Sequence, residues 1–241
     1  MKIAIMSDIH GNLDAFQRVL ADVEEHQISS MVCLGDCIGY GPEPEAVITE
    51  VRRREIPSII GNHEMAVCDR LHLNWFNPLA RSSLEKTLTM LSPESMAYIK
   101  TLPYSRVLYN ARFVHGYPPD SARTYLFRKA GHELRNTFET MAEPICFVGH
   151  THDLEMIQFD DRHLERWALP QGVTSLDAKK RYIINIGSVG QPRDGTNHAK
   201  FVIWDTEYRQ VEVRFIRYDI AATVAKIKAA GLPETHAERL W

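Results

Sequence analysis

The amino-acid sequence predicts an α/β fold formed by a single domain over residues 1–241. Short apolar runs recur along the chain, and each is apolar on both alternations, as strands buried on both faces of a sheet are. Segments with apolar residues at helical spacing separate the first of these runs. A chain with 44% hydrophobic residues at this length can bury one large core.

The first part of the chain alternates predicted strands and helices. An apolar run at residues 3–6 precedes a helix predicted from residue 13 to about residue 25. A second run at 31–34 precedes a helix over about 44–54, which has a proline at its start. A third short run, 59–60, follows. This alternation is typical of a sheet with parallel strands covered by helices.

Residues 65–110 interrupt the alternation and are predicted to form a helical insertion. Two helices are expected, over about 78–91 and 93–101, because each follows a capping residue and begins with proline. Before them, residues 71–76 include two aromatic side chains. These residues are expected to pack the insertion, and lining a pocket is the alternative.

The remainder of the chain is predicted to be richer in strands. Runs at 113–114 and 145–148 flank a helix marked by apolar residues from 126 to 141 and weakened at Gly131. A final helix is expected from Asp219 to Gly231. The other strands are predicted at 155–159, 163–167, 182–186, 201–204 and 211–216.

Polar side chains follow five of the apolar runs at the point where each run ends. These side chains are Asp8 and His10, Asp36, Asn62 and His63, His115, and His150 and His152. A single histidine in such a place is usually a hydrogen-bonded core or surface group. Coincidence does not explain why such polar groups follow five separate apolar runs. If the runs are neighbours in one sheet, their polar groups share one edge of it, where open α/β sheets bind ligands.

Without His63, this set supplies two carboxylates, one amide oxygen and four imidazoles. A catalytic zinc site typically takes three protein ligands, so the set is large enough for two metal ions. Two divalent ions against two carboxylates leave a net charge of about +2, which suits a phosphate ester. Manganese is the first expectation for the metal, and iron, zinc, nickel and cobalt also accept these ligands.

Composition argues against several other classes of protein. The formal net charge of -3 gives no basic stripe of the kind that binds nucleic acid. No stretch is long enough to cross a membrane, and no signal peptide is expected. Four sparse cysteines favour a reduced, cytoplasmic setting.

Several short motifs resemble, in order, those of the calcineurin-like metallophosphoesterases. They are Asp8-x-His10, Gly35-Asp36, Gly61-Asn62-His63-Glu64, His115 and Gly149-His150-Thr151-His152. The segment 185–190 also resembles small prokaryotic predicted phosphodiesterases of that superfamily. The resemblance implies a four-layer αββα sandwich, with two mixed sheets packed together and helices outside. It also implies that Asp8, His10, Asp36 and His152 hold one metal ion and that Asp36, Asn62, His115 and His150 hold the other.

The expected activity is hydrolysis of a small phosphate ester, including a nucleotide, by in-line attack of a hydroxide held between the metals. His63 is expected to give a proton to the leaving oxygen, or else to donate to a phosphate oxygen. Glu64 could orient His63, but a surface carboxylate is the expectation. The resemblance favours a phosphodiesterase. The alternatives are a phosphomonoesterase, a nucleotide pyrophosphatase or a non-catalytic scaffold like the retromer subunit.

One departure from the superfamily pattern concerns the phosphate clamp. Protein phosphatases of the superfamily carry an Asp-Arg pair shortly after the Gly-Asp motif, and residues 37–41 lack it. Activity on phosphoproteins is therefore not expected. Arg193 is the candidate to contact the phosphate, and a structural role in its loop is the alternative.

Overall fold

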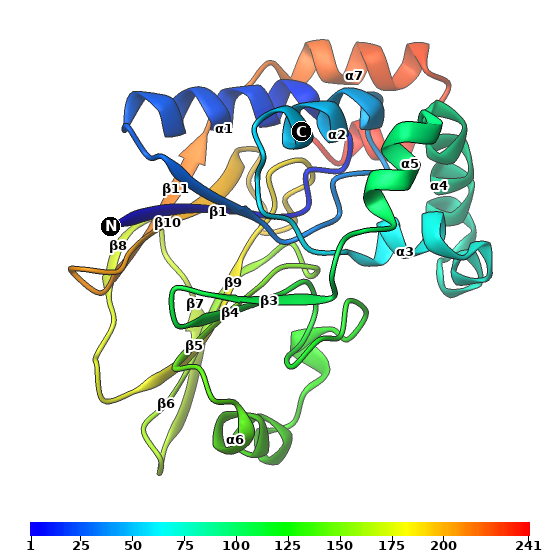
Figure 1. Cartoon of the computed structure of the whole chain (residues 1–241). Helices are drawn as coiled ribbons and strands as arrows, with labels where there is room; N and C mark the ends of the chain where they lie inside the picture. The colour runs from blue at the N-terminus through cyan, green and yellow to red at the C-terminus, as the bar shows by residue number, and fades with distance from the viewer.

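The computed structural model describes residues 1–241 and contains two mixed β-sheets packed face to face (Figure 1). The first sheet has the order β2 (Ser30–Cys33), β1 (Lys2–Met6), β10 (Ala199–Asp205), β11 (Gln210–Ile216) and β8 (Gly172–Ser175). The second has the order β3 (Ser105–Leu108), β4 (Ala111–Val114), β5 (Ile145–Val148), β9 (Arg181–Ile186), β6 (Leu154–Phe159) and β7 (Leu164–Ala168). Strands β1 and β2 are parallel, as are β4, β5 and β9.

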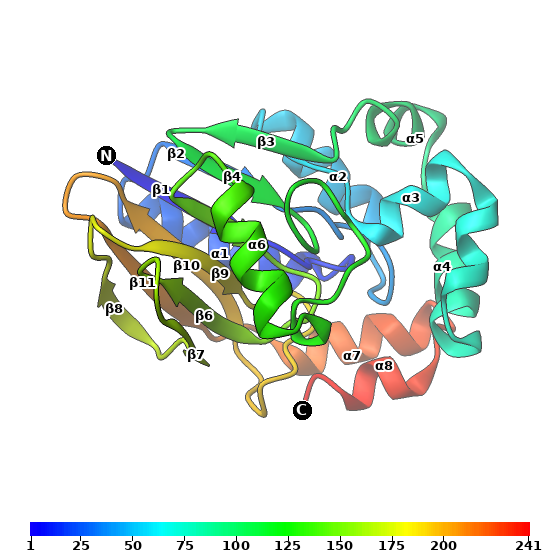
Figure 2. The ribbon, with the colours of Figure 1, turned by 90° about the horizontal axis from the view of Figure 1, so that it is seen from below.

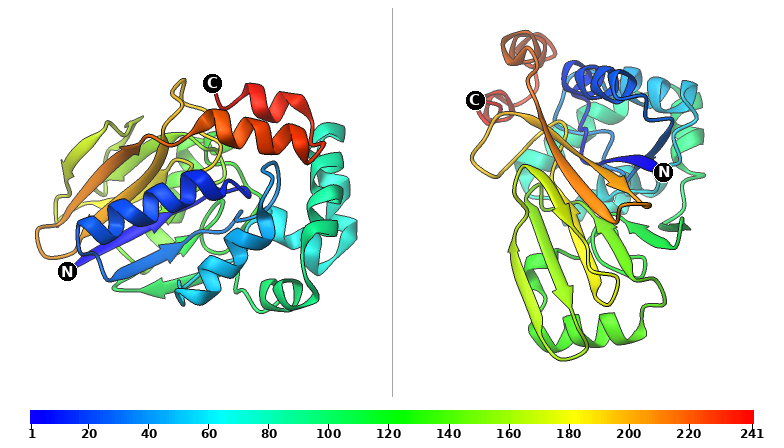
Figure 3. Two further views of the ribbon diagram at one scale, coloured as in Figure 1. Left: turned by 90° about the horizontal axis from the view of Figure 1, so that it is seen from above. Right: turned by 90° about the vertical axis from the view of Figure 1, so that its left-hand side faces the viewer.

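Helices cover the outer faces of both sheets and complete four layers. Helices α1 (Leu13–Glu25) and α2 (Pro44–Arg53) lie over the first sheet, and α7 (Ile220–Ala229) lies beside α1 (Figure 3). Helix α6 (Gly131–Thr140) covers the second sheet. The predicted four-layer αββα sandwich is confirmed.

Strand β1 shows why its run is apolar on both alternations. Ile3 and Ile5 pack between the two sheets, whereas Ala4 and Met6 face the helical layer. All four side chains are fully buried. A central strand of a layered sandwich has no solvent-facing side, and its sequence therefore lacks polar positions.

The predicted helical insertion gathers at one end of the sandwich (Figure 2). Its helices are α3 (Asn62–Cys68), the 3-10 helix η1 (Arg70–Trp75), α4 (Pro78–Met90) and α5 (Pro93–Ile99). The predicted bounds of 65–110 are wrong at both ends, because α3 begins at Asn62 and β3 (Ser105–Leu108) pairs with β4 in the second sheet. Asn77 and Ser92 cap α4 and α5, and each side chain accepts a hydrogen bond from the backbone N–H three residues later. The capping residues thus identified both helices correctly.

Three sequence-based assignments differ from the structure. The helix predicted over 126–141 begins only at Gly131, because Glu133 caps it by accepting from the N–H of Ala130. Residues 59–60 form no strand, and only Ser58 makes an isolated bridge, to Cys33. Strands β3 and β8 and helices α3 and α8 (Glu234–Glu238) were not predicted, since these short elements lack a clear apolar period.

The longest helices, α1 and α4, have 13 residues each, and no helix has the length and apolar character needed to cross a bilayer.

Candidate metal centre

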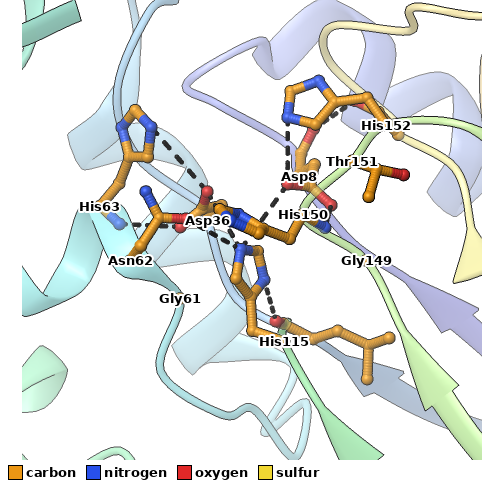
Figure 4. Close-up of polar contacts among 12 residues, drawn as sticks. Asp8, Asp36, Gly61, Asn62, His63, His115, Gly149, His150, Thr151 and His152 are labelled. Atoms are coloured by element: carbon orange, nitrogen blue, oxygen red, sulfur yellow. Dashed lines mark hydrogen bonds and ion pairs between the residues drawn. The ribbon is translucent and has the colours of Figure 1, made fainter. Parts of the chain in front are cut away.

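The candidate ligands converge where the carboxyl ends of strands from both sheets meet (Figure 4). Asp8 follows β1 and Asp36 follows β2 in the first sheet, whereas His115 follows β4 and His150 follows β5 in the second. The expectation of one shared sheet edge is therefore wrong. Face-to-face packing of two sheets brings the two edges together and produces the same convergence.

A first cluster consists of Asp8, His10 and His152, whose ligand atoms lie within 4.8 Å of one another. Oδ1 of Asp8 is 3.2 Å from Nε2 of His152 and 3.6 Å from Nε2 of His10. The two histidine Nε2 atoms are 3.1 Å apart. All three side chains are buried.

A second cluster consists of Asp36, His115 and His150. Oδ2 of Asp36 is 3.2 Å from Nε2 of His115, and Oδ1 of Asn62 lies 3.2 Å from the same nitrogen. Oδ2 of Asp36 is also 3.8 Å from Nε2 of His10 in the first cluster. The Asp36 carboxylate therefore lies between the two clusters.

Backbone carbonyls orient the four clustered histidines. Nδ1 lies 2.9 Å from the Ile38 carbonyl in His10, 2.7 Å from the Leu34 carbonyl in His115 and 2.5 Å from the Gln191 carbonyl in His152. His150 uses its other nitrogen, with Nε2 3.2 Å from the Arg123 carbonyl. A ring nitrogen that faces a carbonyl carries the proton, and its partner then presents a lone pair to the cluster.

The imidazole lone pairs that point into the first cluster have no hydrogen-bond donor, and a cation would compensate them. Nε2 of His10 and Nε2 of His152 are both acceptors in this tautomer, so neither can donate across the 3.1 Å between them. Oδ1 of Asp8 is buried and has no hydrogen-bond partner. A buried carboxylate oxygen without a donor is costly unless an ion compensates it. The donor set of imidazoles and carboxylates therefore fits divalent transition metals.

The backbone around the centre adopts conformations that most residues avoid. Left-handed φ angles occur at Asp8 (55°), His10 (51°), Asp36 (50°), His150 (69°) and His152 (66°). Such angles cost of order 1–3 kcal/mol each and persist mainly at functional sites. Gly61 is also required, because a Cβ there would lie 2.1 Å from Oδ1 of Asp36.

The buried ionisable groups of the centre shift one another's pKa values. Burial opposes ionisation of Asp8 and Asp36, but the surrounding imidazoles outweigh it and hold the pKa of both carboxyls below ordinary values. Burial also acts against charge on His115, yet Asp36 and Asp8 raise its pKa to about 10. Burial lowers the pKa of His150 to about 3 and that of His152 to about 4. Without metal, His115 therefore holds a proton more tightly than His150 or His152.

Metal binding should consequently become stronger as pH rises. His115 carries its proton below its pKa of about 10 and must release it to act as a ligand. We expect the apparent affinity for Mn²⁺ to increase about tenfold per pH unit between about pH 6.5 and 8. Competition titration with a fluorescent chelator measures this slope. A pH-independent affinity would contradict it.

Glu64 is buried and is not the surface carboxylate expected from the sequence. One oxygen accepts from the backbone N–H groups of Asp36 (2.8 Å) and Gly61 (2.9 Å), and the other from those of Cys37 (2.7 Å) and Ile38 (3.3 Å). Glu64 therefore fixes the loop that carries Asp36 and does not contact His63. Burial raises its pKa to about 7, assisted by the neighbouring Asp36 charge.

Replacing Glu64 by alanine should lower the free energy of unfolding by about 3 kcal/mol or more, because buried N–H donors lose their acceptor. Glu64→Gln retains one acceptor oxygen and should cost roughly half as much. Urea unfolding measures both effects. The control Glu139→Ala removes an exposed glutamate of α6 that forms no side-chain hydrogen bond or ion pair, and it should change stability by less than about 0.5 kcal/mol. A Glu64→Ala variant as stable as this control would contradict the role.

His63 lies beside the clusters, is buried, and lines a cavity of about 360 Å³. Its Nε2 is 3.9 Å from Oδ2 of Asp36, and its Nδ1 has no hydrogen-bond partner. The ring is held by aromatic neighbours, with centroids 4.7 Å from Tyr40 and 4.9 Å from Phe76. His63 thus differs from the four clustered histidines, whose rings backbone carbonyls orient.

Arg193, the candidate phosphate contact from the sequence, lines the same cavity. Three further lining residues were not identified from the sequence: Arg123 and Tyr125, from the loop after β4, and Arg128, from the short 3-10 helix η2 (Leu126–Arg128). The Tyr125 ring stacks on His150 with centroids 4.0 Å apart. Trp75 also lines the cavity, as does Phe76, so residues 71–76 contribute to a pocket wall. Loop residues such as these follow no period that a sequence pattern could detect.

Two packed mixed sheets, outer helices and buried histidine–aspartate clusters at their common end define the architecture of a metal-dependent phosphoesterase. A model of the calcineurin-like phosphoesterase superfamily domain matches residues 1–209. The chain belongs to this superfamily, whose members depend on divalent metals and act on phosphate esters.

Relatives cover almost the whole chain. An uncharacterized protein of Methanocaldococcus jannaschii is 34% identical over 248 residues, which cover 99% of this chain and 97% of that protein. The crystal structure of a metallophosphoesterase from Sphaerobacter thermophilus has 36% identity and a TM-score of 0.87, covering 100% of this chain and 98% of the other. A hypothetical protein from Pyrococcus horikoshii, 18% identical, shares the fold with a TM-score of 0.80 and coverage of 100% and 97%.

Proposed function

We propose that this protein is a phosphodiesterase that hydrolyses a small phosphodiester with two divalent metal ions, manganese being the first candidate. One observation carries the proposal: the Asp36 carboxylate lies between two ligand clusters at the base of a cavity. A shared carboxylate is typical of two-metal hydrolytic sites.

The two proposed ligand sets share one carboxylate. Asp8, His10, Asp36 and His152 would hold one ion, and Asp36, Asn62, His115 and His150 would hold the other, as the observed clusters and the short distances from Asp36 to His10 and from Asn62 to His115 support. When bound, a pair of divalent ions supplies an activated water for in-line attack and positive charge to offset the phosphate oxygens. The backbone carbonyls that face Nδ1 of His10, His115 and His152 hold these rings in place with their other nitrogen toward the clusters.

The chain's own groups then bind the ester and handle the proton. Water oxygen adds to phosphorus and releases one proton to solvent, the bond from phosphorus to the leaving oxygen breaks, and the leaving oxygen takes a proton from a ring that solvent then reprotonates. His63 faces this position and donates from its ring. Arg193 borders the same cavity and binds a non-bridging phosphate oxygen. Its loop is anchored by the buried Lys200, whose Nζ lies 2.7 Å from Oδ1 of Asp194.

The test compares bis-p-nitrophenyl phosphate with p-nitrophenyl phosphate in the presence of Mn²⁺, alongside elemental analysis of the purified protein. The proposal expects two ions per chain and a higher kcat/KM for the diester. Preference for the monoester would support a phosphomonoesterase instead. A metal-loaded protein that cleaves neither ester nor a nucleotide pyrophosphate would support the scaffold alternative.

A further inference from the structure

The cavity at the metal centre continues into a second one of about 560 Å³. The two cavities share the lining residues Tyr40, Asn77, Ala80, Tyr125 and Arg193. They therefore form one cleft with two lobes. We call the second cavity the distal lobe. A diester has two substituents on phosphorus, and a two-lobed cleft offers each substituent its own compartment.

The wall of the distal lobe is contributed by the C-terminal helices. Helix α8 supplies His236, and Arg239 and Trp241 follow it. The superfamily domain model ends at residue 209, so this wall lies outside the part of the chain that the model describes. Figure 2 shows α7 and α8 beside α4, at the same end of the sandwich as the insertion. Residues of this wall can thus set substrate preference without altering the ligand set.

Contacts to the rest of the fold hold this wall in place. Nζ of Lys226 on α7 lies 2.8 Å from Oδ1 of Asp14 and 2.9 Å from Oε2 of Glu43. Nζ of Lys86 on α4 donates to the Gly231 carbonyl at 3.0 Å. Between the helices, Ile227 and Leu240 belong to a small buried apolar cluster. The distal lobe is therefore a supported surface and can present fixed side chains to a ligand.

Electrostatics point to an anionic occupant. Arg193 and Arg239 are charged residues of the distal lobe, and no aspartate or glutamate side chain lines it. Neither guanidinium forms an ion pair with a carboxylate; that of Arg193 donates to the side-chain oxygen of Gln191 at 3.2 Å and also contacts Tyr40. Two unpaired guanidinium groups facing one concave surface favour a group that accepts forked hydrogen bonds, such as a phosphate or phosphonate.

A buried histidine connects the distal lobe to the metal centre. His236 is only 1% exposed, and neither of its ring nitrogens has a hydrogen-bond partner in the protein. Its ring centroid is 4.8 Å from that of Tyr40, which in turn is 4.6 Å from that of His10. Tyr40 lies at the junction of the two lobes. A polar side chain buried without partners in a cavity wall is unusual and indicates a site built for a ligand.

We propose that the distal lobe binds a second anionic, phosphate-like group carried by one substituent of the diester, and that Arg239 determines this specificity. This inference rests on the proposed phosphodiesterase function and extends it to a substrate class. The substrates are diesters in which the substituent that stays bonded to phosphorus carries an additional phosphate or phosphonate.

Two matched substrates test the inference. One is p-nitrophenyl 3-phosphonopropyl phosphate and the other is p-nitrophenyl butyl phosphate, which has a similar length but no second charge. With Mn²⁺ present, we expect kcat/KM to be at least about tenfold higher for the phosphonate. Arg239→Gln should reduce this preference about tenfold. The control Lys228→Gln changes an exposed cation on α7 that pairs with Glu234 and does not line the lobe, and it should keep the preference.

The outcomes separate the two proposals. Hydrolysis of both esters with equal efficiency, or a preference that Arg239→Gln leaves intact, overturns the distal-lobe inference while the phosphodiesterase function stands. If neither ester nor bis-p-nitrophenyl phosphate is hydrolysed, the proposed function is overturned. In that case, isothermal titration calorimetry of the same two esters tests the distal-lobe inference without hydrolysis. Binding of the phosphonate that is about tenfold tighter, and that Arg239→Gln abolishes, supports the inference. Equal binding of the two esters overturns it.

Discussion

Replacing Asp36 by asparagine should lower kcat for a phosphodiester by at least about 10³-fold. The substitution keeps the size of the side chain and removes the Asp36 carboxylate between the two clusters, whose Oδ2 is 3.2 Å from Nε2 of His115 and 3.8 Å from Nε2 of His10. An amide donates hydrogen bonds through its nitrogen and bears no charge, so it cannot balance two cations. The loss corresponds to about 4 kcal/mol of transition-state stabilisation.

Metal content and thermal unfolding distinguish a lost centre from a lost fold. In the wild type, Mn²⁺ should raise the unfolding temperature, because the ions bind only the folded chain. Asp36→Asn should show less than the full metal content and a smaller upward shift. The control Asp120→Asn makes the same charge change at an exposed loop position and should behave as wild type. Wild-type turnover in Asp36→Asn would exclude Asp36 as the shared ligand.

The positions of the candidate ligands could be predicted because each depends on a short stretch of chain. Asp8 and His10 come directly after the buried strand β1, and His150 and His152 come directly after the buried strand β5. The sheet that each strand joins is not encoded in the strand itself. The convergence was therefore expected at one sheet edge, whereas it occurs where two sheets meet.

Other features depend on tertiary contacts that no local pattern contains. Glu64 is buried because the loop at Asp36, which lies 28 residues earlier, supplies N–H donors to it. Tyr125 reaches His150 from a loop, and Arg239 reaches the cleft only because α7 and α8 fold back beside α4. Polar and aromatic residues on such segments have the same sequence signature as ordinary surface residues.

Replacing His63 by alanine should lower kcat about 10²- to 10⁴-fold and leave the metal content unchanged. No backbone carbonyl holds its ring, its Nδ1 has no partner, and its Nε2 faces the cleft 3.9 Å from Oδ2 of Asp36. Its ligand atom also lies within 4.8 Å of those of His10 and Asp36, so elemental analysis is essential. Loss of metal in His63→Ala would identify the ring as a ligand and overturn the catalytic assignment.

A comparison of leaving groups separates proton donation from phosphate binding by His63. If the ring protonates the leaving oxygen, His63→Ala should slow an alkyl phosphodiester far more than a p-nitrophenyl one, since nitrophenolate leaves without protonation. Equal losses would restrict the ring to an N–H hydrogen bond with a phosphate oxygen. Burial, assisted by neighbouring imidazoles, holds the pKa of His63 well below its ordinary value, so the free protein has a neutral ring near pH 7. Proton donation therefore requires the negative charge of bound substrate to raise that pKa, and kcat for the alkyl ester should fall as pH rises above the raised value.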